Sequence, residues 1–216
     1  MADDDLVLIR RLLRESLKKG DLLEMFEQNR DRYRVLVHLI QHPLLPVHLS
    51  LDILPQLNPY DLVRVIKNTR ANPYVRRKAE LEFAARYRKL PLGEKVALLK
   101  SAPPSLLLQF VEENHPRLLE AILRNPLCTE DLVVRFINRP GERSQFYRTL
   151  DATNWHVYAG VAQALVRDVE APIKMMLKVI PFVGLEELQR LLKDEATHES
   201  VRQGIRHYLE QRRKVQ

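Results

Sequence analysis

The chain has 216 residues, of which 45 % are hydrophobic and 29 % are charged, and its formal net charge is +7. This balance is typical of a globular protein that is long enough to bury a core. The acidic start Met1-Ala2-Asp3-Asp4-Asp5 argues against a secretory signal peptide, and no apolar run reaches the ~20 residues that a membrane span needs. One cysteine, Cys128, excludes an internal disulfide. We therefore expect a cytoplasmic protein without a membrane span.

The pattern of apolar residues predicts helices throughout the chain. Apolar side chains recur at three-to-four spacing, glycine is rare with six residues, and many of the thirteen prolines stand near expected helix starts. A first helix is expected from about Asp5 to Lys19, with Gly20 ending it, and a second from Asp21 to Gln28. Residues 1–30 are thus predicted to form an N-terminal cap that covers the end of a helical stack.

A self-similarity of the chain defines its repeating element. When Val35–Arg76 is shifted by 126 residues onto Val161–Arg202, ten of the 42 positions are identical and no gap is needed. Because 126 is three times 42, the shift indicates a repeat of about 42 residues, a period typical of helical solenoids. Equivalent positions follow at intervals of 40, 43, 43 and 40 residues, namely Val35, Val75, Leu118, Val161 and Val201.

Asn-Pro and His-Pro pairs mark the joints between the predicted helices. Proline in the first turn of a helix loses no hydrogen bond, and the residue before it is pushed out of helical geometry. We expect repeats that begin near Asp31, Asn72, His115 and Asn154 and fill residues 31–196, followed by a closing helix in residues 197–216. A three-helix repeat of this size cannot bury its own apolar face, so it leans on its neighbours. The sequence predicts an all-α protein, a right-handed α-solenoid of about four such repeats with capping helices at its ends.

Several segments resemble bacterial HEAT-like and armadillo-like repeat proteins. They are Asn72-Pro73-Tyr74-Val75-Arg76, Leu92-Gly93-Glu94-Lys95, His115-Pro116 with Asn125-Pro126, and Trp155 with Leu165-Val166-Arg167-Asp168. The resemblance covers almost the whole chain from about Tyr33 onward. It implies a binding scaffold rather than an enzyme. One departure is that the arginine after the valine, present at Arg76 and Arg202, is replaced by Leu119 and Ala162, which would interrupt a charge ladder between repeats.

Two histidines have a spacing that zinc sites use. His38 and His42 lie four residues apart on one predicted helix, so both imidazoles could reach one ion. No acidic residue lies between them, and the repeat aligns His42 with Asn125 and Asp168 at the same helix joint. We interpret His42 as a joint residue and expect no metal site.

The remaining candidates for chemistry also have structural explanations. Cys128 could be a nucleophile, but it aligns with small and medium packing residues at the equivalent joints. Glu112 and Glu113 point ~100° apart on a helix, because they are adjacent in sequence. The solvated face of a helix explains four acidic residues near the end of the last repeat, Glu186, Glu187, Asp194 and Glu195. We therefore predict no enzyme, no catalytic residue and no cofactor.

Basic residues concentrate in the second repeat. Between Arg64 and Lys100 there are eleven basic and three acidic residues, so the local charge of +8 exceeds the +7 of the whole chain. Such a surface attracts acidic protein segments or phosphate backbones, although arginine and lysine also commonly fill solvated helix faces. The candidate partner-binding residues are Arg70, Arg77, Lys78, Arg86, Lys89 and the only tryptophan, Trp155, which is either a wedge between repeats or a binding anchor.

Two functions fit these observations. The first is a non-catalytic interaction scaffold that binds a protein or peptide, preferably an acidic one, on the solenoid surface. The second is nucleic-acid binding by a basic groove. A continuous positive groove on the folded chain would favour nucleic acid, and scattered charge would favour the scaffold.

Overall fold

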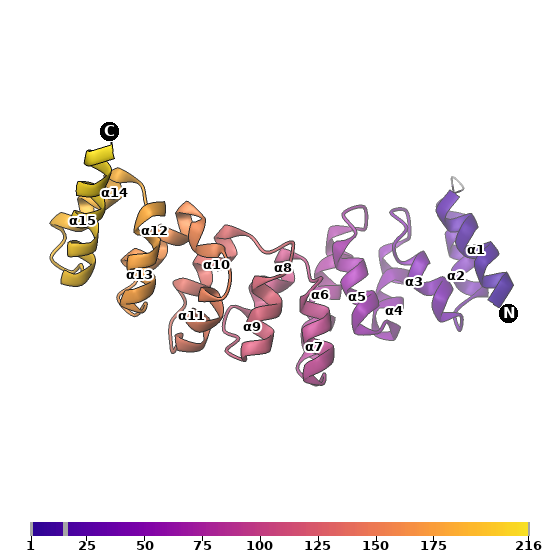
Figure 1. Cartoon of the computed structure of the whole chain (residues 1–216). Helices are drawn as coiled ribbons and strands as arrows, with labels where there is room; N and C mark the ends of the chain where they lie inside the picture. Colours follow the sequence, from indigo (N-terminus) through magenta and orange to yellow (C-terminus); the bar gives the residue numbers. More distant parts are fainter. Residues whose placement is uncertain (1, 15–16, 216) are drawn as a thin grey trace. The chain divides into compact units, whose positions relative to one another are not determined.

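The described part of the chain consists of helices and the turns that join them (Figure 1). A computed structural model describes residues 2–14 and 17–215, and no strand occurs among them. The all-α fold class predicted from the sequence is therefore confirmed. Within these residues no helix combines the length and the apolar character that a membrane crossing requires.

The chain divides into two compact units, Met1–Leu98 and Leu99–Gln216, here called unit 1 and unit 2. The division falls inside α7 (Leu92–Leu99). The other helices of unit 1 are α1 (Ala2–Arg14), α2 (Lys19–Gln28), α3 (Tyr33–Leu39), α4 (Val47–Ile53), the 3-10 helix η1 (Leu54–Gln56), α5 (Pro59–Lys67) and α6 (Pro73–Tyr87).

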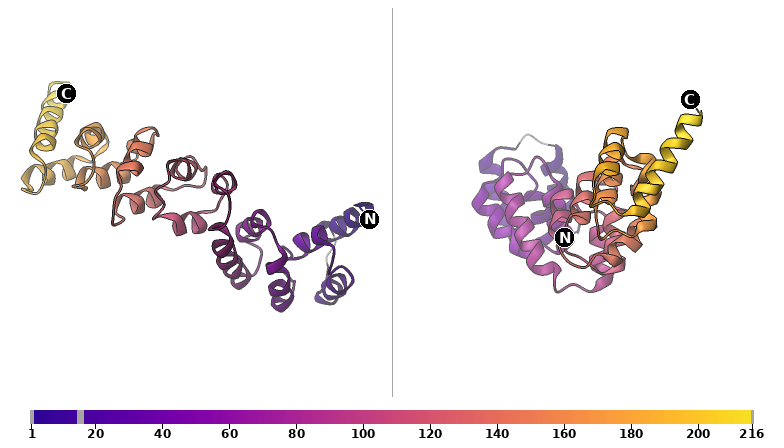
Figure 2. Two further views of the ribbon diagram at one scale, coloured as in Figure 1. Left: turned by 90° about the horizontal axis from the view of Figure 1, so that it is seen from below. Right: turned by 90° about the vertical axis from the view of Figure 1, so that its left-hand side faces the viewer.

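Unit 2 contains eight further α-helices and three 3-10 helices among its described residues. They are α8 (Pro104–Leu107), η2 (Leu108–Phe110), α9 (Pro116–Leu123), α10 (Glu130–Ile137), α11 (Ser144–Asp151), η3 (Trp155–Val157), α12 (Ala159–Arg167), α13 (Ile173–Val179), η4 (Ile180–Phe182), α14 (Leu185–Lys193) and α15 (Glu199–Val215). Figure 2 shows α15, in yellow, extending beyond the other helices of unit 2.

Three of the five Asn-Pro and His-Pro pairs predicted to mark joints start helices, whereas Pro43 and Pro126 lie in turns between helices. α5, α6 and α9 each have proline as their first residue. The residue before each proline caps the helix: Asn58 accepts from the Asp61 N–H at 2.9 Å, Asn72 from the Tyr74 N–H at 2.8 Å, and His115 from the Arg117 N–H at 3.3 Å. A side-chain acceptor at this position satisfies a backbone donor that the helix leaves free.

The start of the chain differs from the prediction. α1 ends at Arg14 rather than near Lys19, residues 15–16 lie outside the described part, and Gly20 lies in the first turn of α2 instead of ending α1. The physical reason is a cap, because the Asp21 carboxylate accepts a hydrogen bond from the Lys18 N–H at 2.8 Å and starts α2 before the glycine. The prediction that Gly20 ends the first helix was wrong.

Several helices begin and end at equivalent residues when the chain is shifted by the 126 residues that relate its similar segments. Shifted by 126 residues, α4, η1 and α5 coincide residue by residue with α13, η4 and α14, and α6 begins at the residue equivalent to the start of α15. Burial follows the same interval, since Val35, Val161, Leu62 and Leu188 are all 0 % exposed. The sequence identity is therefore matched by local structure and by the positions that form the cores.

Within unit 2 the helices form two rows. α9 packs against α11, α10 packs against α12, and α12 also contacts α13. Figure 1 shows α9, α11 and α13 following one another along the lower edge of unit 2, with α10 and α12 above them. The lower row carries the candidate site.

Candidate binding groove

Only some of the basic residues predicted to bind a partner are free to do so. Arg86 is used inside unit 1, because its guanidinium donates to the carbonyl oxygens of Leu57 and Pro55, the latter at 2.7 Å, and pairs with Glu82 at 2.5 Å. It thereby fastens α6 to η1. A cation so fully used has few N–H groups left for a ligand.

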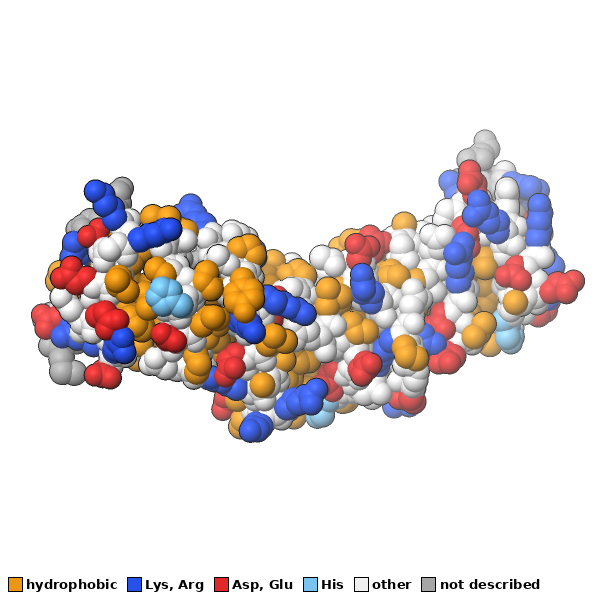
Figure 3. All heavy atoms as spheres, turned by 180° about the vertical axis from the view of Figure 1, so that it is seen from behind, with side chains coloured by type: hydrophobic (Ala, Val, Ile, Leu, Met, Phe, Trp, Pro, Cys, Tyr) orange, Lys and Arg blue, Asp and Glu red, His pale blue; other side chains and the backbone are white. Residues whose placement is uncertain are grey.

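The other four predicted residues lie at the surface of unit 1. Arg77 pairs with Glu80 at 2.8 Å, and the Lys78 ammonium lies 5.5 Å from the centre of the Tyr74 ring. Arg70 and Lys89 are exposed and have no ion-pair partner among the described residues. On the face drawn in Figure 3, Lys and Arg side chains are mixed with Asp and Glu and do not form one positive strip.

Trp155, the remaining predicted residue, lies in η3 and holds that segment against α9. Its indole N–H donates to the Leu123 carbonyl oxygen at 2.8 Å, across 32 residues of sequence. Its ring lies 5.0 Å from the ring of Tyr158, which is 48 % exposed. The tryptophan therefore acts as a wedge, and together with Tyr158 it also presents aromatic surface.

A groove runs between α9 and α11 and ends at this aromatic pair. One cavity of about 310 Å³ is lined by Trp155, Tyr158 and Arg124, and a second of about 260 Å³ is lined by Arg117, Arg124 and Arg148. The two cavities share Arg124, Ala152 and Thr153, so they lie next to one another. We call this feature the arginine groove and define it by Arg117, Glu120, Arg124, Arg148, Trp155 and Tyr158.

Helix periodicity places the charged groups of the groove. On α9, Arg117 and Glu120 are three residues apart and are exposed, whereas Leu118, Leu119 and Ile122 between and beyond them are buried. On α11 the exposed Arg148 follows the buried Phe146 and Tyr147. Because α9 packs against α11, the two charged faces border the same space.

The groove carries a surplus of positive charge. Arg124 pairs with Glu120 at 3.1 Å, and with side chains 64 % and 54 % exposed this pair is weak. Arg117 and Arg148 have no ion-pair partner among the described residues. Three guanidinium groups therefore face one carboxylate, and the free donors can bind an anion.

The positive charge does not continue from α11 to α13. The next cavity, of about 450 Å³, is lined by three basic residues, Arg143, Arg148 and Lys174, and by three carboxylates, Glu142, Asp151 and Glu170, so it carries no surplus of positive charge. Asp151 forms an ion pair with Lys178 at 2.8 Å. The arginine groove is therefore a local site bounded by acidic groups.

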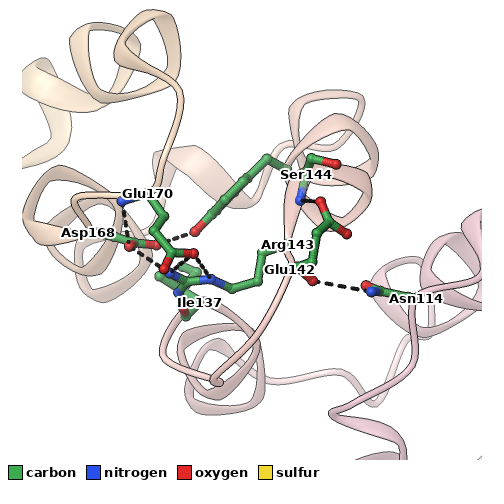
Figure 4. Close-up of polar contacts among 8 residues, drawn as sticks. Asn114, Ile137, Glu142, Arg143, Ser144, Asp168 and Glu170 are labelled. Atoms are coloured by element: carbon green, nitrogen blue, oxygen red, sulfur yellow. Dashed lines mark hydrogen bonds and ion pairs between the residues drawn. The ribbon is translucent and has the colours of Figure 1, made fainter.

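A cluster of polar side chains around Arg143 borders the cavity of about 450 Å³ and holds neighbouring helices together. Figure 4 shows its guanidinium pointing between Asp168 and Glu170 and toward Ile137. The ion-pair distances are 3.0 Å to Asp168 and 2.8 Å to Glu170, and the same group donates to the Ile137 carbonyl oxygen. Burial and the neighbouring Asp168 raise the pKa of Tyr147, whose hydroxyl donates to Asp168. The cluster fastens α11 to the joint after α12.

The candidates for catalysis and metal binding have structural roles. His42, Asn125 and Asp168 each accept a hydrogen bond from the N–H two residues ahead, at 3.2, 2.7 and 3.1 Å, as expected for equivalent joint residues. Burial raises the pKa of Cys128 to about 12, so its thiol stays protonated and is a poor nucleophile. Among the described residues no group of three or more His, Cys, Asp or Glu side chains is arranged to hold a metal ion.

One predicted surface residue is buried. Glu187 was expected on a solvated face, but its side chain is 8 % exposed and binds the Arg167 guanidinium with distances of 2.5 and 2.6 Å. This contact lowers the pKa of Glu187. The prediction was wrong because Arg167 comes from α12, and nothing in the local pattern of α14 indicates that partner.

Sequence reasoning missed Arg117, Arg124 and Arg148. They are spread over 32 residues that also contain acidic side chains, so no local surplus of charge marks them. The available signal was weaker: arginines recur on the exposed faces of two helices that a repeat would place side by side. None of the family models, curated proteins or solved structures with which the chain was compared matches it.

Proposed function

We propose that this protein is a non-catalytic interaction scaffold, built as an α-solenoid of HEAT-like repeats, which binds an acidic segment of a partner protein in the arginine groove. The observation that carries the proposal is that Arg117 and Arg148, which form no ion pair among the described residues, lie on two packed helices beside the half-buried Trp155 and the exposed Tyr158. The 126-residue correspondence of helices supports the repeat architecture.

The groove offers two kinds of contact to an extended peptide. Carboxylates of the peptide form charge-assisted hydrogen bonds with Arg117 and Arg148, which are stronger than bonds between neutral groups. An apolar side chain of the peptide packs on the exposed face of Tyr158, and aromatic surface of this kind is enriched where binding energy concentrates. Charge selects acidic segments, and the aromatic pair fixes their position.

A single-stranded nucleic acid is the alternative ligand, because bases stack on aromatic rings beside a basic groove. A nucleic-acid strand carries a negative charge at every residue, however, and it would meet Glu120 in the groove and three carboxylates in the next cavity. A peptide can place its charges only where the arginines are. The protein partner is therefore the better fit.

The test uses the full chain and a matched pair of charge-reversal variants. R117E/R148E changes the groove, and R70E/K89E changes two exposed, unpaired basic residues of unit 1. Each substitution changes the charge by −2, so both variants go from +7 to +3. Circular dichroism verifies that both remain folded. Binding is measured by fluorescence anisotropy with an Asp- and Glu-rich degenerate peptide library and with mixed-sequence single-stranded DNA.

We expect R117E/R148E to weaken binding of the acidic library at least about tenfold, the equivalent of about 1.4 kcal/mol, and R70E/K89E to leave it within about twofold. Equal losses in both variants would mean that net charge, not the groove, drives binding. Tighter binding of DNA than of peptides, with a steep dependence on salt concentration, would support the nucleic-acid alternative instead.

A further inference from the structure

We propose that the arginine groove recognises a phosphorylated serine or threonine of its partner, with the phosphoryl group between Arg117 and Arg148 and a neighbouring apolar residue on the Trp155–Tyr158 pair. This inference rests on the proposed function and specifies its ligand. It follows from the number of free donors, from the shape of the site and from the charges around it.

The free donors of the groove exceed what one carboxylate can accept. Each guanidinium carries five N–H donors, whereas a carboxylate offers about four acceptor positions. Arg117 and Arg148 use none of these donors in ion pairs within the described residues. A phosphoryl group brings three strong acceptor oxygens and a charge of about −1.5 to −2 at pH 7, which balances the two cations.

The two arginines approach the same space from different helices. Arg117 comes from the first turn of α9 and Arg148 from α11, and both line the cavity of about 260 Å³. Thr149 lines it as well, but its hydroxyl already donates to the Gln145 carbonyl oxygen at 2.9 Å. Recognition of an anion therefore depends on the arginines, and bidentate contacts from two directions suit a tetrahedral group.

The surrounding charges favour one phosphoryl group over a chain of them. Glu120 lies in the same cavity as the arginines, and Glu142, Asp151 and Glu170 line the cavity on the other side of α11. Repeated phosphates would be repelled at these positions. A single phosphorylated side chain in the segment avoids the repulsion that a chain of phosphates would meet.

The aromatic pair supplies the second contact of the peptide. The hydrogen bond from Trp155 to Leu123 fixes its ring, and Tyr158 and Val157 beside it are 48 % and 44 % exposed. The cavity at this surface adjoins the arginine cavity, because Ala152 and Thr153 line both. An apolar residue next to the phosphorylated one can therefore reach the pair without leaving the groove.

The experiment compares three degenerate peptide libraries that differ only at their central residue, which is phosphoserine, serine or glutamate. Anisotropy is measured with the full chain, with R117Q/R148Q, with R117K/R148K and with the control R70Q/K89Q. We expect the phosphoserine library to bind at least about tenfold more tightly than the other two. R117Q/R148Q should remove this preference, R117K/R148K should reduce it because lysine lacks the bidentate fork, and the control should keep it.

A pH series adds a readout that a general preference for acidic peptides would not give. The second ionisation of a phosphoryl group has a pKa near 6, so binding of the phosphoserine library should weaken as the pH falls from about 7.5 to about 5.5. Glutamate remains ionised over this range. Binding of the glutamate library should therefore change with pH only as far as groups of the protein itself titrate.

The outcomes separate this inference from the proposed function. If the glutamate library binds as tightly as the phosphoserine library and depends equally on Arg117 and Arg148, the phosphoryl preference is overturned while the scaffold proposal stands. If all three libraries bind equally to R117Q/R148Q and to the unchanged protein, or if none binds to either, the groove is not the peptide site and both proposals fail.

Discussion

His42, His115 and His198 all use their Nδ1 atom to accept a backbone hydrogen bond at a helix joint. The donors are the N–H groups two residues ahead, at 3.2, 3.3 and 3.2 Å. Asparagine and aspartate have the same role at other joints of this chain. An imidazole differs from them in one respect, because protonation of Nδ1 removes the acceptor.

This difference predicts that the stability of the protein depends on His42 in a pH-dependent way. Burial lowers the pKa of His42 in the folded state, so the unfolded chain binds the proton first as the pH falls. The contribution of His42 is complete above the ordinary pKa of about 6.5, decreases as the pH falls through that value, and stops changing below the lowered folded pKa. H42N keeps an acceptor that does not titrate and should lose less stability on acidification.

Urea unfolding at pH 8 and pH 5.5 measures this effect. H42N should be close to the unchanged protein at pH 8 and more stable than it at pH 5.5. H48N is the control, because His48 is exposed and its replacement removes an imidazole without removing a joint acceptor. If H42N and the unchanged protein lose the same stability between the two pH values, the joint does not sense pH.

Trp155 forms a structural hydrogen bond and lies beside the exposed ring of Tyr158, and two variants separate these roles. W155F removes the N–H that donates to Leu123 but keeps a ring beside Tyr158, so it should lower the free energy of unfolding by about 1 kcal/mol and change peptide binding little. Y158A removes a 48 % exposed ring and should weaken binding with little loss of stability. Circular dichroism must follow unfolding, because W155F removes the only tryptophan.

At the scale of single residues, sequence patterns predicted the features that depend on contacts between residues close together in the chain. Asn58, Asn72 and His115 were recognisable as helix caps because each bonds to a residue two or three positions ahead. Trp155 bonds across 32 residues and Glu187 across 20, so their partners follow from how helices pack. The arginine groove is of the same kind, since it exists only where α9 meets α11.

At the scale of elements, α11 depends on a buried cation. The Arg143 and Asp168 side chains are 9 % and 8 % exposed, so removal of the arginine leaves a buried carboxylate without its counter-charge. R143M should destabilise the protein by about 3–5 kcal/mol, the usual cost of breaking one side of a buried pair. Denaturant unfolding measures this loss.

Two further variants locate the cause of that loss. R148M removes an exposed arginine from the same helix and should change stability by no more than about 0.5 kcal/mol. R143M/D168N removes both charges and should recover part of the loss. Equal effects of R143M and R148M would show that the buried cluster does not hold α11 in place.

The positions of the elements were largely predictable, and the failures have physical causes. Prolines and their capping neighbours fixed the starts of α5, α6 and α9, and the 126-residue shift related α4 to α13 and α5 to α14. The 3-10 turns η1 and η4 were not predicted. Pro55 and Pro181, each the second residue of its turn, lack the N–H that would continue the preceding α-helix, so the chain tightens there.

At the scale of the whole molecule, the chain forms two compact units whose boundary lies inside α7. That position falls within the second predicted repeat rather than between repeats. Each unit nevertheless has its own fully buried leucines and valines, and those at positions 35, 39 and 62 of unit 1 recur 126 residues later in unit 2 as Val161, Leu165 and Leu188. Equivalent residues thus contribute to the cores of both units.

This repetition predicts equal costs at equivalent positions. Leu62 in α5 and Leu188 in α14 are both 0 % exposed, so L62A and L188A should each cost about 2–5 kcal/mol and agree closely with one another. The exposed Leu81 provides the control L81A, which should be almost neutral. Hydrogen exchange tells where each variant acts.

L62A should lower amide protection in unit 1 and L188A in unit 2, because each leucine belongs to the core of its own unit and local opening is confined to cooperative groups of residues. Peptide binding in the arginine groove should then be sensitive to L188A and insensitive to L62A under conditions that populate local opening. If both variants lowered protection evenly along the chain, the two cores would unfold as one, and the groove would depend on residues throughout the molecule.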